Sequence, residues 1–305
     1  MIVAKDLRIG LIGLDTSHVE GFTKVFHDKN DPNYISGGKV VIAYPGGSDD
    51  FAMSYNRIDK YTQLLREDYS VEITHTIEEV AEQSDAILIT SVDGRIHEKQ
   101  FEAIAKYKCP VFIDKPFATS VDSAKRMIEL AKKYGTPLMS CSPLRFDESL
   151  TNILNDDTKG KIVGADCYGP MDLEDTQPGL FWYGIHTVEM LYTILGPGCK
   201  SVLAYKNKEN DVVVGEWEDG RVGVVRGNRY NNREFGSTIH RENGSLTSNS
   251  NESKRSFHYY QAKNIYNFMK RKESNVDLDT TLEIIKFIQA TNESRKSGKI
   301  VQLSS

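Results

Sequence analysis

Short apolar runs alternate with amphipathic stretches over the first part of the chain. Helical spacing lies between the runs, as in HEKQFEAIAKY at 97–107. Strands that alternate with helices are typical of a parallel sheet in an α/β domain. The pattern therefore predicts an N-terminal, Rossmann-like, doubly wound parallel sheet. Its expected strands are 7–13, 39–44, 71–75, 85–91 and 109–114.

Beyond the segment TPLMSCSPLRF the pattern changes. Strand-like runs at 201–206, 211–227 and 236–248 follow one another around Asp-Gly and Asn-Gly turn signals. They predict a mostly antiparallel, open sheet in a C-terminal α+β domain. The last amphipathic stretch is expected to be a helix that ends at Gly298, a residue type favoured just after helices.

A chain of 305 residues is longer than one hydrophobic core usually organises, so two domains are expected. We place a dinucleotide-binding domain at 1–118 and a substrate-binding and oligomerisation domain at 119–305. The helix and strand at 119–142 would bridge them, and the C-terminal helix could pack back. The polar stretch at 27–38 is predicted to be a surface loop.

The segment RIGLIGLDTSHVEGF is a strand, a glycine turn and a helix start. A dinucleotide-binding turn would be G-x-G-x-x-G, but Asp15 and His18 hold the positions of the second and third glycines after Gly13. Ser17 and Glu20 form a capping box that starts the helix at His18, where a phosphate could bind. A carboxylate at Asp15 would oppose the phosphate unless it points away or binds backbone. Cofactor binding and a purely structural turn both remain open at this stage.

The formal net charge of −5 gives no reason to expect nucleic acid or an anionic membrane as partner, so a small molecule is expected. The first ten residues lack the apolar core of a signal peptide, and no apolar run approaches the ~20 residues that span a bilayer. We therefore expect a cytoplasmic protein. Four widely spaced cysteines fit reduced thiols better than disulfides or a zinc site: Cys109, Cys141, Cys167 and Cys199.

Several motifs occur in the order found in the family of glucose-fructose oxidoreductase, inositol dehydrogenase and MocA proteins, and nearly the whole chain resembles it. CPVFIDKPFATSVDSAKRMIELAKKYGTPL resembles that family's strand ending in E-K-P, with Asp114, Lys115 and Pro116 in those positions. GIHTVEMLYTILG resembles its G-x-H-x-x-D run, with His186 and Glu189 matching, and ESRKSGKIVQL is similar to its last helix and strand.

This resemblance implies a Rossmann domain that binds NAD or NADP, followed by a domain whose open sheet joins subunits into a homodimer or homotetramer. It also implies an oxidoreductase that acts by hydride transfer on a sugar, cyclitol or related polyol. In active members a lysine, a histidine and an aspartate line the reacting carbon. The lysine and histidine carry over as Lys115 and His186, but Trp182 stands where the aspartate is expected, four residues before the histidine.

The alternative is a noncatalytic dinucleotide- or metabolite-binding protein of the same fold. As an enzyme, the chain would use His186 as the base and Lys115 to stabilise the substrate oxygen. Trp182 and Tyr183 would join both at the substrate. The residues expected at the cofactor are Gly13, Leu14, Asp15, Thr16, Ser17, His18, Tyr44, Thr90, Ser91, His97, Asp114 and Lys115, although His97 also fits a capping or packing role.

Coenzyme choice depends on the end of the second strand, VVIAYPGG. Tyr44 and Pro45 stand where an acid would bind the adenosine ribose, and no arginine is present to bind a 2′-phosphate. This favours NAD over NADP. No metal site is expected, because Asp15 with His18 and His186 with Glu189 are only isolated pairs.

Overall fold

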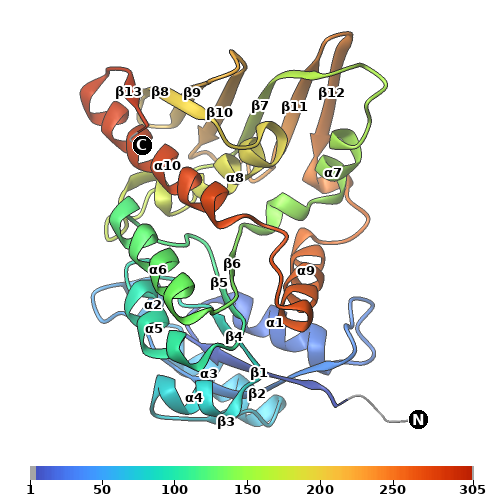
Figure 1. Ribbon diagram of the computed structural model, residues 1–305, viewed down its shortest axis with the longest axis vertical. Helices are drawn as coiled ribbons and strands as arrows, with labels where there is room; N and C mark the ends of the chain where they lie inside the picture. The colour runs from blue at the N-terminus through green and yellow to red at the C-terminus, as the bar shows by residue number, and fades with distance from the viewer. Residues whose placement is uncertain (1–4, 304–305) are drawn as a thin grey trace. The chain divides into compact units, whose positions relative to one another are not determined.

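The chain is represented by a computed structural model in which residues 5–303 are described (Figure 1). They form two compact units. The first contains the chain up to Ala118 together with 122–141 and 262–278, and the second contains the remainder. The chain therefore returns to the first unit after most of the second has been built.

The first unit contains a parallel six-stranded sheet of order β3-β2-β1-β4-β5-β6, which confirms the predicted Rossmann-like arrangement. The central strands consist of apolar residues that are buried on both faces of the sheet, which is typical of parallel sheets. All four residues of β4, for example, are buried. The strands are β1 (Leu7–Ile12), β2 (Gly38–Tyr44), β3 (Glu72–Ile73), β4 (Ala86–Ile89), β5 (Val111–Ile113) and β6 (Leu138–Ser140).

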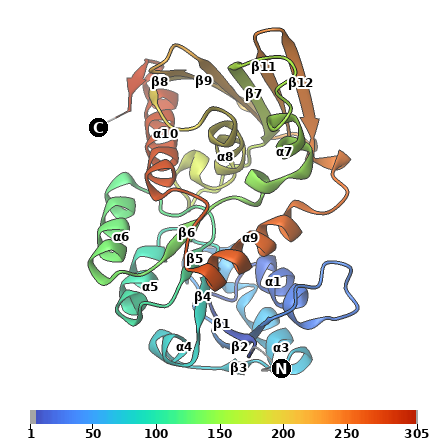
Figure 2. The ribbon, with the colours of Figure 1, turned by 45° about the vertical axis from the view of Figure 1, so that its right-hand side comes forward.

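Helices cover both faces of this sheet. On one side α1 (Ser17–His27) contacts α3 (Ile58–Asp68), and on the other α4 (Ile77–Gln83) contacts α5 (His97–Ile104), with α6 (Val121–Tyr134) beside α5 (Figures 1 and 2). The first unit also contains the short α2 (Ala52–Tyr55), the turn η1 (Ala105–Tyr107) and most of α9 (Phe257–Arg271). Helix α9 is next to α1, where the rings of Tyr266 and Phe26 are 6.0 Å apart.

The start of α1 differs slightly from the sequence prediction. The helix begins at Ser17, one residue before His18, and its N-cap is Thr16, whose hydroxyl accepts from the backbone N–H of His18 at 3.4 Å. Thr16 has the extended backbone that a cap needs, and both threonine and serine are good caps. The local sequence therefore predicted the start of α1, but the helix is capped by Thr16 and not by the adjacent Ser17.

The second unit contains a mixed seven-stranded sheet of order β12-β11-β7-β10-β9-β8-β13. Its neighbouring strands pair antiparallel except β7 and β10, which run parallel. The predicted mostly antiparallel sheet is thus confirmed. The strands are β7 (Ile162–Pro170), β8 (Cys199–Lys206), β9 (Asn210–Trp217), β10 (Val222–Asn228), β11 (Gly236–Arg241), β12 (Gly244–Asn249) and β13 (Val301–Gln302).

The almost fully buried helix α8 (Gly184–Leu195) packs on β7 and β10. Beside it, α10 (Leu278–Ser297) contacts α8 through the rings of Phe287 and Tyr192, and it ends at Gly298 as predicted. Shorter elements complete the unit: η2 (Pro143–Phe146), α7 (Glu148–Leu154), η3 (Gly179–Phe181) and η4 (Ser250–Glu252).

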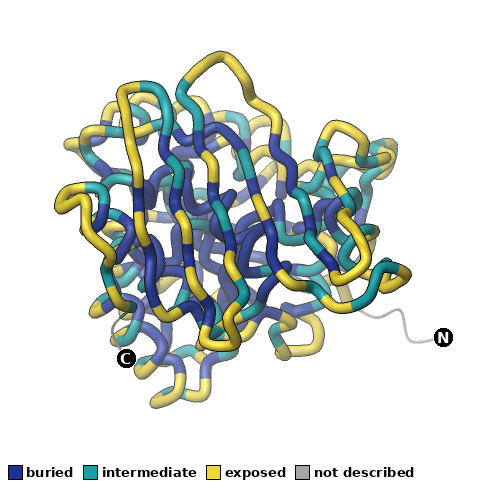
Figure 3. Tube along the Cα trace, turned by 90° about the horizontal axis from the view of Figure 1, so that it is seen from above, coloured by how far each residue is buried: buried dark blue, intermediate teal, exposed yellow. Residues whose placement is uncertain are grey.

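None of the described elements covers the other face of this sheet. Exposed and buried residues alternate along its strands (Figure 3). Leu203, Val214 and Val222 are 41%, 40% and 45% exposed, and the register places Leu203 opposite Val214 on neighbouring strands. An apolar patch therefore lies on β8, β9 and β10. Among the described residues, none of the helices combines the length and apolar character needed to cross a bilayer.

Candidate functional site

The strand order of the first sheet reverses between β1 and β4, and such switch points form a ligand-binding crevice beyond the strands' carboxyl ends. Gly13 follows β1 with φ +94°, and a Cβ there would lie 2.5 Å from the backbone nitrogen of Ser91. The hydroxyl of Thr90 donates to the Gly13 carbonyl at 2.6 Å. The turns after β1 and β4 are therefore in direct contact, which only glycine at position 13 permits.

Asp15 points into the protein. Its side chain is buried, Oδ2 accepts from the Ser54 hydroxyl at 2.6 Å, and Oδ1 accepts from the Val92 backbone N–H at 2.9 Å. Burial raises the pKa of Asp15, and these two hydrogen bonds oppose that shift. The expectation that Asp15 would bind backbone is confirmed, and its carboxylate oxygens are engaged inside the protein.

A polar network around Asp15 was not anticipated from the sequence. Ser48 donates its backbone N–H to Ser54 Oγ at 2.9 Å and its hydroxyl to Asp93 at 2.7 Å. Arg95 then bridges Asp93 and Asp50. These contacts join the loops after β2 and β4. The only sequence signals are a Ser-Asp-Asp run and an Asp-Gly turn, neither of which names a partner.

His18, at the third glycine position, joins α1 to the end of β5. Its Nδ1 lies 2.5 Å from Oδ2 of the buried Asp114. Burial raises the pKa of Asp114, but His18 and Lys115 outweigh it and bring that pKa down to about 2. Burial in turn lowers the pKa of Lys115, whose cationic form Asp114 favours. Three of the predicted site residues, His18, Asp114 and Lys115, therefore lie together at the end of β5.

His97 clamps two loops rather than facing solvent. The side chain is fully buried, with Nδ1 2.9 Å from the Pro116 carbonyl and Nε2 2.8 Å from the Ser91 carbonyl. It thereby ties the loop after β4 to the loop that carries Lys115. This contact pattern matches the packing role that was the alternative reading of His97.

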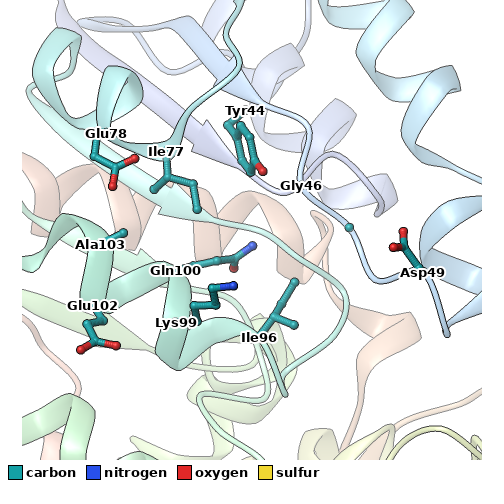
Figure 4. A pocket seen from close by; sticks show the side chains of 11 residues that line it. Tyr44, Gly46, Asp49, Ile77, Glu78, Ile96, Lys99, Gln100, Glu102 and Ala103 are labelled. Carbon is teal, nitrogen blue, oxygen red and sulfur yellow. The ribbon is translucent and has the colours of Figure 1, made fainter.

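A pocket of about 650 Å³ lies at the end of β2 and against α5 (Figure 4). Ile77 and Ile96 supply apolar walls, whereas Tyr44, Lys99 and Gln100 supply polar groups. Small-molecule sites have this size and this mixture of apolar surface with a few polar groups. The complete lining is Tyr44, Gly46, Gly47, Asp49, Ile77, Glu78, Ile96, Lys99, Gln100, Glu102 and Ala103.

These residues fit the adenosine end of a dinucleotide. The pocket is at the strand ends where Rossmann folds bind that moiety, and Tyr44, which was predicted to contact the cofactor, is one of its lining residues. Gly46 has φ +63° and approaches Gly13, so the backbone after β2 runs beside the first turn. The amino end of α1 is favourable for the phosphates, since the Asp15 carboxylate is buried on the protein side.

In the second unit, Ser142 and His186 form a buried pair. Ser142 Oγ lies 2.7 Å from His186 Nδ1. The ring of His186 is also flanked by Tyr183 and Phe235, with centroids 5.1 and 5.7 Å away. Tyr183 and His186 are thus brought together as predicted, whereas Ser142 was missed because it is 44 residues away in sequence.

Trp182 is buried, with 7% of its surface exposed. It follows η3, and α8 begins two residues later at Gly184, so Trp182 and His186 do not share one continuous helix. Further along α8, Glu189 forms a buried ion pair with Arg145. Lys115 belongs to the first unit and these residues to the second. Within residues 5–303, no cluster of three or more His, Cys, Asp or Glu side chains could hold a metal.

Residues 8–141, which contain the six strands of the first sheet except for Leu7 at the start of β1, match the family described as "Oxidoreductase family, NAD-binding Rossmann fold" (GFO_IDH_MocA). The match is to the NAD-binding part of the Gfo/Idh/MocA oxidoreductases, and it covers less than half of the 305-residue chain. The family resemblance is therefore confirmed over residues 8–141, which contain the Asp-Lys-Pro motif, whereas the Gly-x-His motif at 184–186 lies outside the matched residues.

One curated relative is inositol 2-dehydrogenase of Rhodococcus jostii, which is 28% identical over 139 residues. That match spans 40% of this chain and 38% of the relative's length.

Solved structures resemble the whole chain. The apo scyllo-inositol dehydrogenase of Lactobacillus casei has a TM-score of 0.79 at 14% identity, and the match covers 100% of both chains. The myo-inositol dehydrogenase of Corynebacterium glutamicum has a TM-score of 0.77 at 15% identity and covers 98% of this chain and 99% of its own. At these identities the structures show a shared fold over both units.

Proposed function

We propose that the chain is an NAD-dependent dehydrogenase that oxidises one carbinol of a cyclitol or sugar-like polyol. The observation that carries the proposal is the pocket at the end of β2, adenosine-compatible in size and lining, within a sheet that matches an NAD-binding oxidoreductase family. The substrate class is suggested by relatives named as inositol dehydrogenases.

Two side chains have the chemistry that such a reaction needs. The hydride acceptor for the carbinol carbon would be supplied by NAD when it is bound. His186 would take the hydroxyl proton, because a neutral imidazole is a suitable base near neutral pH. The ammonium of Lys115 would stabilise the negative charge that develops on the substrate oxygen. Trp182 would offer an apolar wall to the C–H face of the polyol ring, because indole has a large aromatic surface. Indole can neither accept the proton nor orient an imidazolium by charge, so Trp182 would not act as the base.

The charges around the pocket support NAD over NADP. Asp49, Glu78 and Glu102 line it with a single lysine, Lys99, so carboxylates outnumber ammonium groups by two. A 2′-phosphate would add a charge of about −2 to this already negative surface. The hydroxyl of an unphosphorylated ribose avoids that repulsion and can hydrogen-bond to Gln100 or Tyr44, which line the same pocket.

The uncovered face of the second sheet supports a homo-oligomer, as the resemblance implied. Apolar patches of this kind are uncommon on monomers and mark interaction sites. A second copy of the chain would present the same patch, so the contact would be isologous.

A noncatalytic dinucleotide- or metabolite-binding protein is the second candidate. Trp182 in the place of the expected aspartate favours it, because this chain lacks one group of the family's reacting set. A dehydrogenase and a noncatalytic dinucleotide-binding protein would both bind the cofactor at the same site, but only the dehydrogenase would oxidise a polyol.

Isothermal titration calorimetry of the unliganded chain with NAD and with NADP tests whether the chain binds a dinucleotide, which both functions require. We expect NAD to bind in the micromolar range and more tightly than NADP. Absence of binding by either coenzyme at millimolar concentration would remove the dehydrogenase and leave a metabolite-binding protein. Binding without oxidation of any polyol would favour the noncatalytic candidate.

A further inference from the structure

We infer that Ser142 is the positioning residue of His186 and fills the orienting role that the expected aspartate would have. Ser142 would set the tautomer and orientation of the imidazole, and the effect of this on turnover rests on the proposed dehydrogenase function. Ser142 Oγ and His186 Nδ1 are 2.7 Å apart, and both side chains are buried.

Ser142 is itself held from two sides. It caps η2, where its hydroxyl accepts from the Leu144 backbone N–H at 3.3 Å. Its own backbone N–H donates to the carboxylate of Glu189, one turn along α8 from His186. Arg145 Nε donates to the same carboxylate at 2.5 Å. The hydroxyl that meets His186 is therefore fixed to the helix that carries the histidine.

The charge on Glu189 makes this support rigid. Burial raises the pKa of Glu189, whereas Arg145 and the Ser142 backbone N–H favour its ionised form. An ion pair buried in this way is costly to break, because either partner alone would be a buried unpaired charge. The pair thus keeps η2 and α8 in register, and Ser142 with them.

The contact determines which nitrogen can act. If Nδ1–H donates to Ser142 Oγ, the lone pair of the imidazole is on Nε2, which then accepts the substrate proton. Without the hydroxyl, this tautomer loses its partner in a buried site. Trp182 cannot replace it, because an indole N–H only donates. Serine provides orientation but no negative charge, so it would not stabilise the imidazolium as a carboxylate does.

The direct test is nitrogen-15 NMR of the imidazoles in the unliganded full chain, at a pH where His186 is neutral. We expect His186 in the wild type to be protonated at Nδ1, and Ser142→Ala to shift it toward protonation at Nε2. Ser237→Ala is the matched control, since it removes another buried serine hydroxyl, one that contacts Ser248. A wild-type His186 protonated at Nε2, or a tautomer unchanged by Ser142→Ala, would overturn the inference.

Turnover adds the catalytic consequence. Ser142→Ala should lower kcat roughly 10- to 100-fold with little change in KM, because it weakens the base without removing a substrate contact. Ser142→Thr keeps a hydroxyl and should retain most activity, and Ser142→Ala should have no further effect in a His186→Ala background. An undiminished kcat in Ser142→Ala would contradict this consequence.

The NMR and turnover measurements distinguish a failure of the positioning role of Ser142 from a failure of the proposed dehydrogenase function. If the NMR result is as expected but the wild type oxidises no polyol, Ser142 positions His186 and the dehydrogenase proposal fails. If the wild type turns over and the tautomer does not respond to Ser142→Ala, the enzyme stands and the positioning role fails.

Discussion

His18 Nδ1 lies 2.5 Å from Asp114 Oδ2, so the residue at the third glycine position of the first turn is bonded to the end of β5. Asp15, at the second glycine position, is bonded to the loop after β4. The two departures from a glycine fingerprint are thus both cross-links between neighbouring turns. Where glycines would leave the turn without side-chain contacts, His18 and Asp15 fix it to the neighbouring loops. The Asp15 carboxylate is buried as a result.

Removal of the His18 side chain should destabilise the first unit in a pH-dependent way. The pKa of Asp114 is about 2 in the folded chain, below its ordinary 3.8, so its ionised form stabilises the fold above about pH 4, and this stabilisation is lost as pH falls toward 2. We expect His18→Ala to lower the free energy of unfolding by about 1–2 kcal/mol at about pH 6.

Urea denaturation at several pH values measures this difference. The gap between wild type and His18→Ala should narrow as pH falls from about 4 toward 2. A gap that stays constant over that range would show that His18 stabilises the unit by packing, for instance against Phe22, with which its ring makes an edge contact.

Lys115→Met should abolish turnover without destabilising the protein. Because burial lowers the pKa of Lys115 below 10.5, the folded chain releases this proton at lower pH than the unfolded chain. The desolvation cost of the partly buried ammonium is present at neutral pH and is relieved as pH rises through the folded pKa toward 10.5. Urea denaturation should therefore show stability equal to or above wild type at pH 7, with the difference shrinking at alkaline pH.

Lys29→Met is the control for this substitution, because Lys29 is an exposed residue of the loop after α1. It should leave both turnover and stability near wild type. Clear destabilisation by Lys115→Met at neutral pH would mean that the ammonium is a net stabiliser of the fold.

Glu78→Lys should shift coenzyme preference toward NADP. The substitution replaces a carboxylate in the lining of the pocket by an ammonium, and one such contact is worth about 1 kcal/mol near water. The NADP to NAD affinity ratio should rise roughly 3- to 10-fold by titration calorimetry. Glu79→Lys makes the same charge change at the adjacent, exposed residue outside the lining and should shift the ratio less. Equal shifts would assign the effect to overall charge.

Val214→Lys should dissociate the proposed oligomer. Val214 is 40% exposed in the apolar patch, and an ammonium there would be buried unpaired against a second copy. Light scattering should give a larger mass for wild type than for the variant at micromolar concentration. Leu173→Lys, at an exposed apolar residue in the loop after β7, should keep the wild-type mass. A monomeric wild type would contradict the proposed assembly.

The elements of the fold were predictable where hydrophobic patterning is strong. Continuous apolar runs marked the buried strands of the first sheet, and Gly298 marked the end of α10, because these features depend on neighbours in sequence. Local sequence could not indicate that β7 and β10 pair in parallel, since their register depends on distant segments.

The candidate site was predictable only in part. Lys115 and His186 were proposed from motifs, and Tyr44 from its position after β2; their roles in the site stay predictions. Ser54 and Ser142 were missed because a serine signals nothing by itself; its role appears only when Asp15 or His186 is found beside it. Such long-range polar contacts leave no periodic pattern in the sequence.

The most direct test of the proposed dehydrogenase is the appearance of NADH absorbance when the wild-type chain is mixed with NAD and a panel of inositols and sugars, beside His186→Ala and Trp182→Phe. We predict turnover of at least one polyol by the wild type, a loss of roughly 100-fold or more in kcat for His186→Ala, and only a modest loss of ligand binding for Trp182→Phe. Full turnover by His186→Ala would show that His186 is not the base, and no turnover by the wild type despite bound NAD would contradict the dehydrogenase itself.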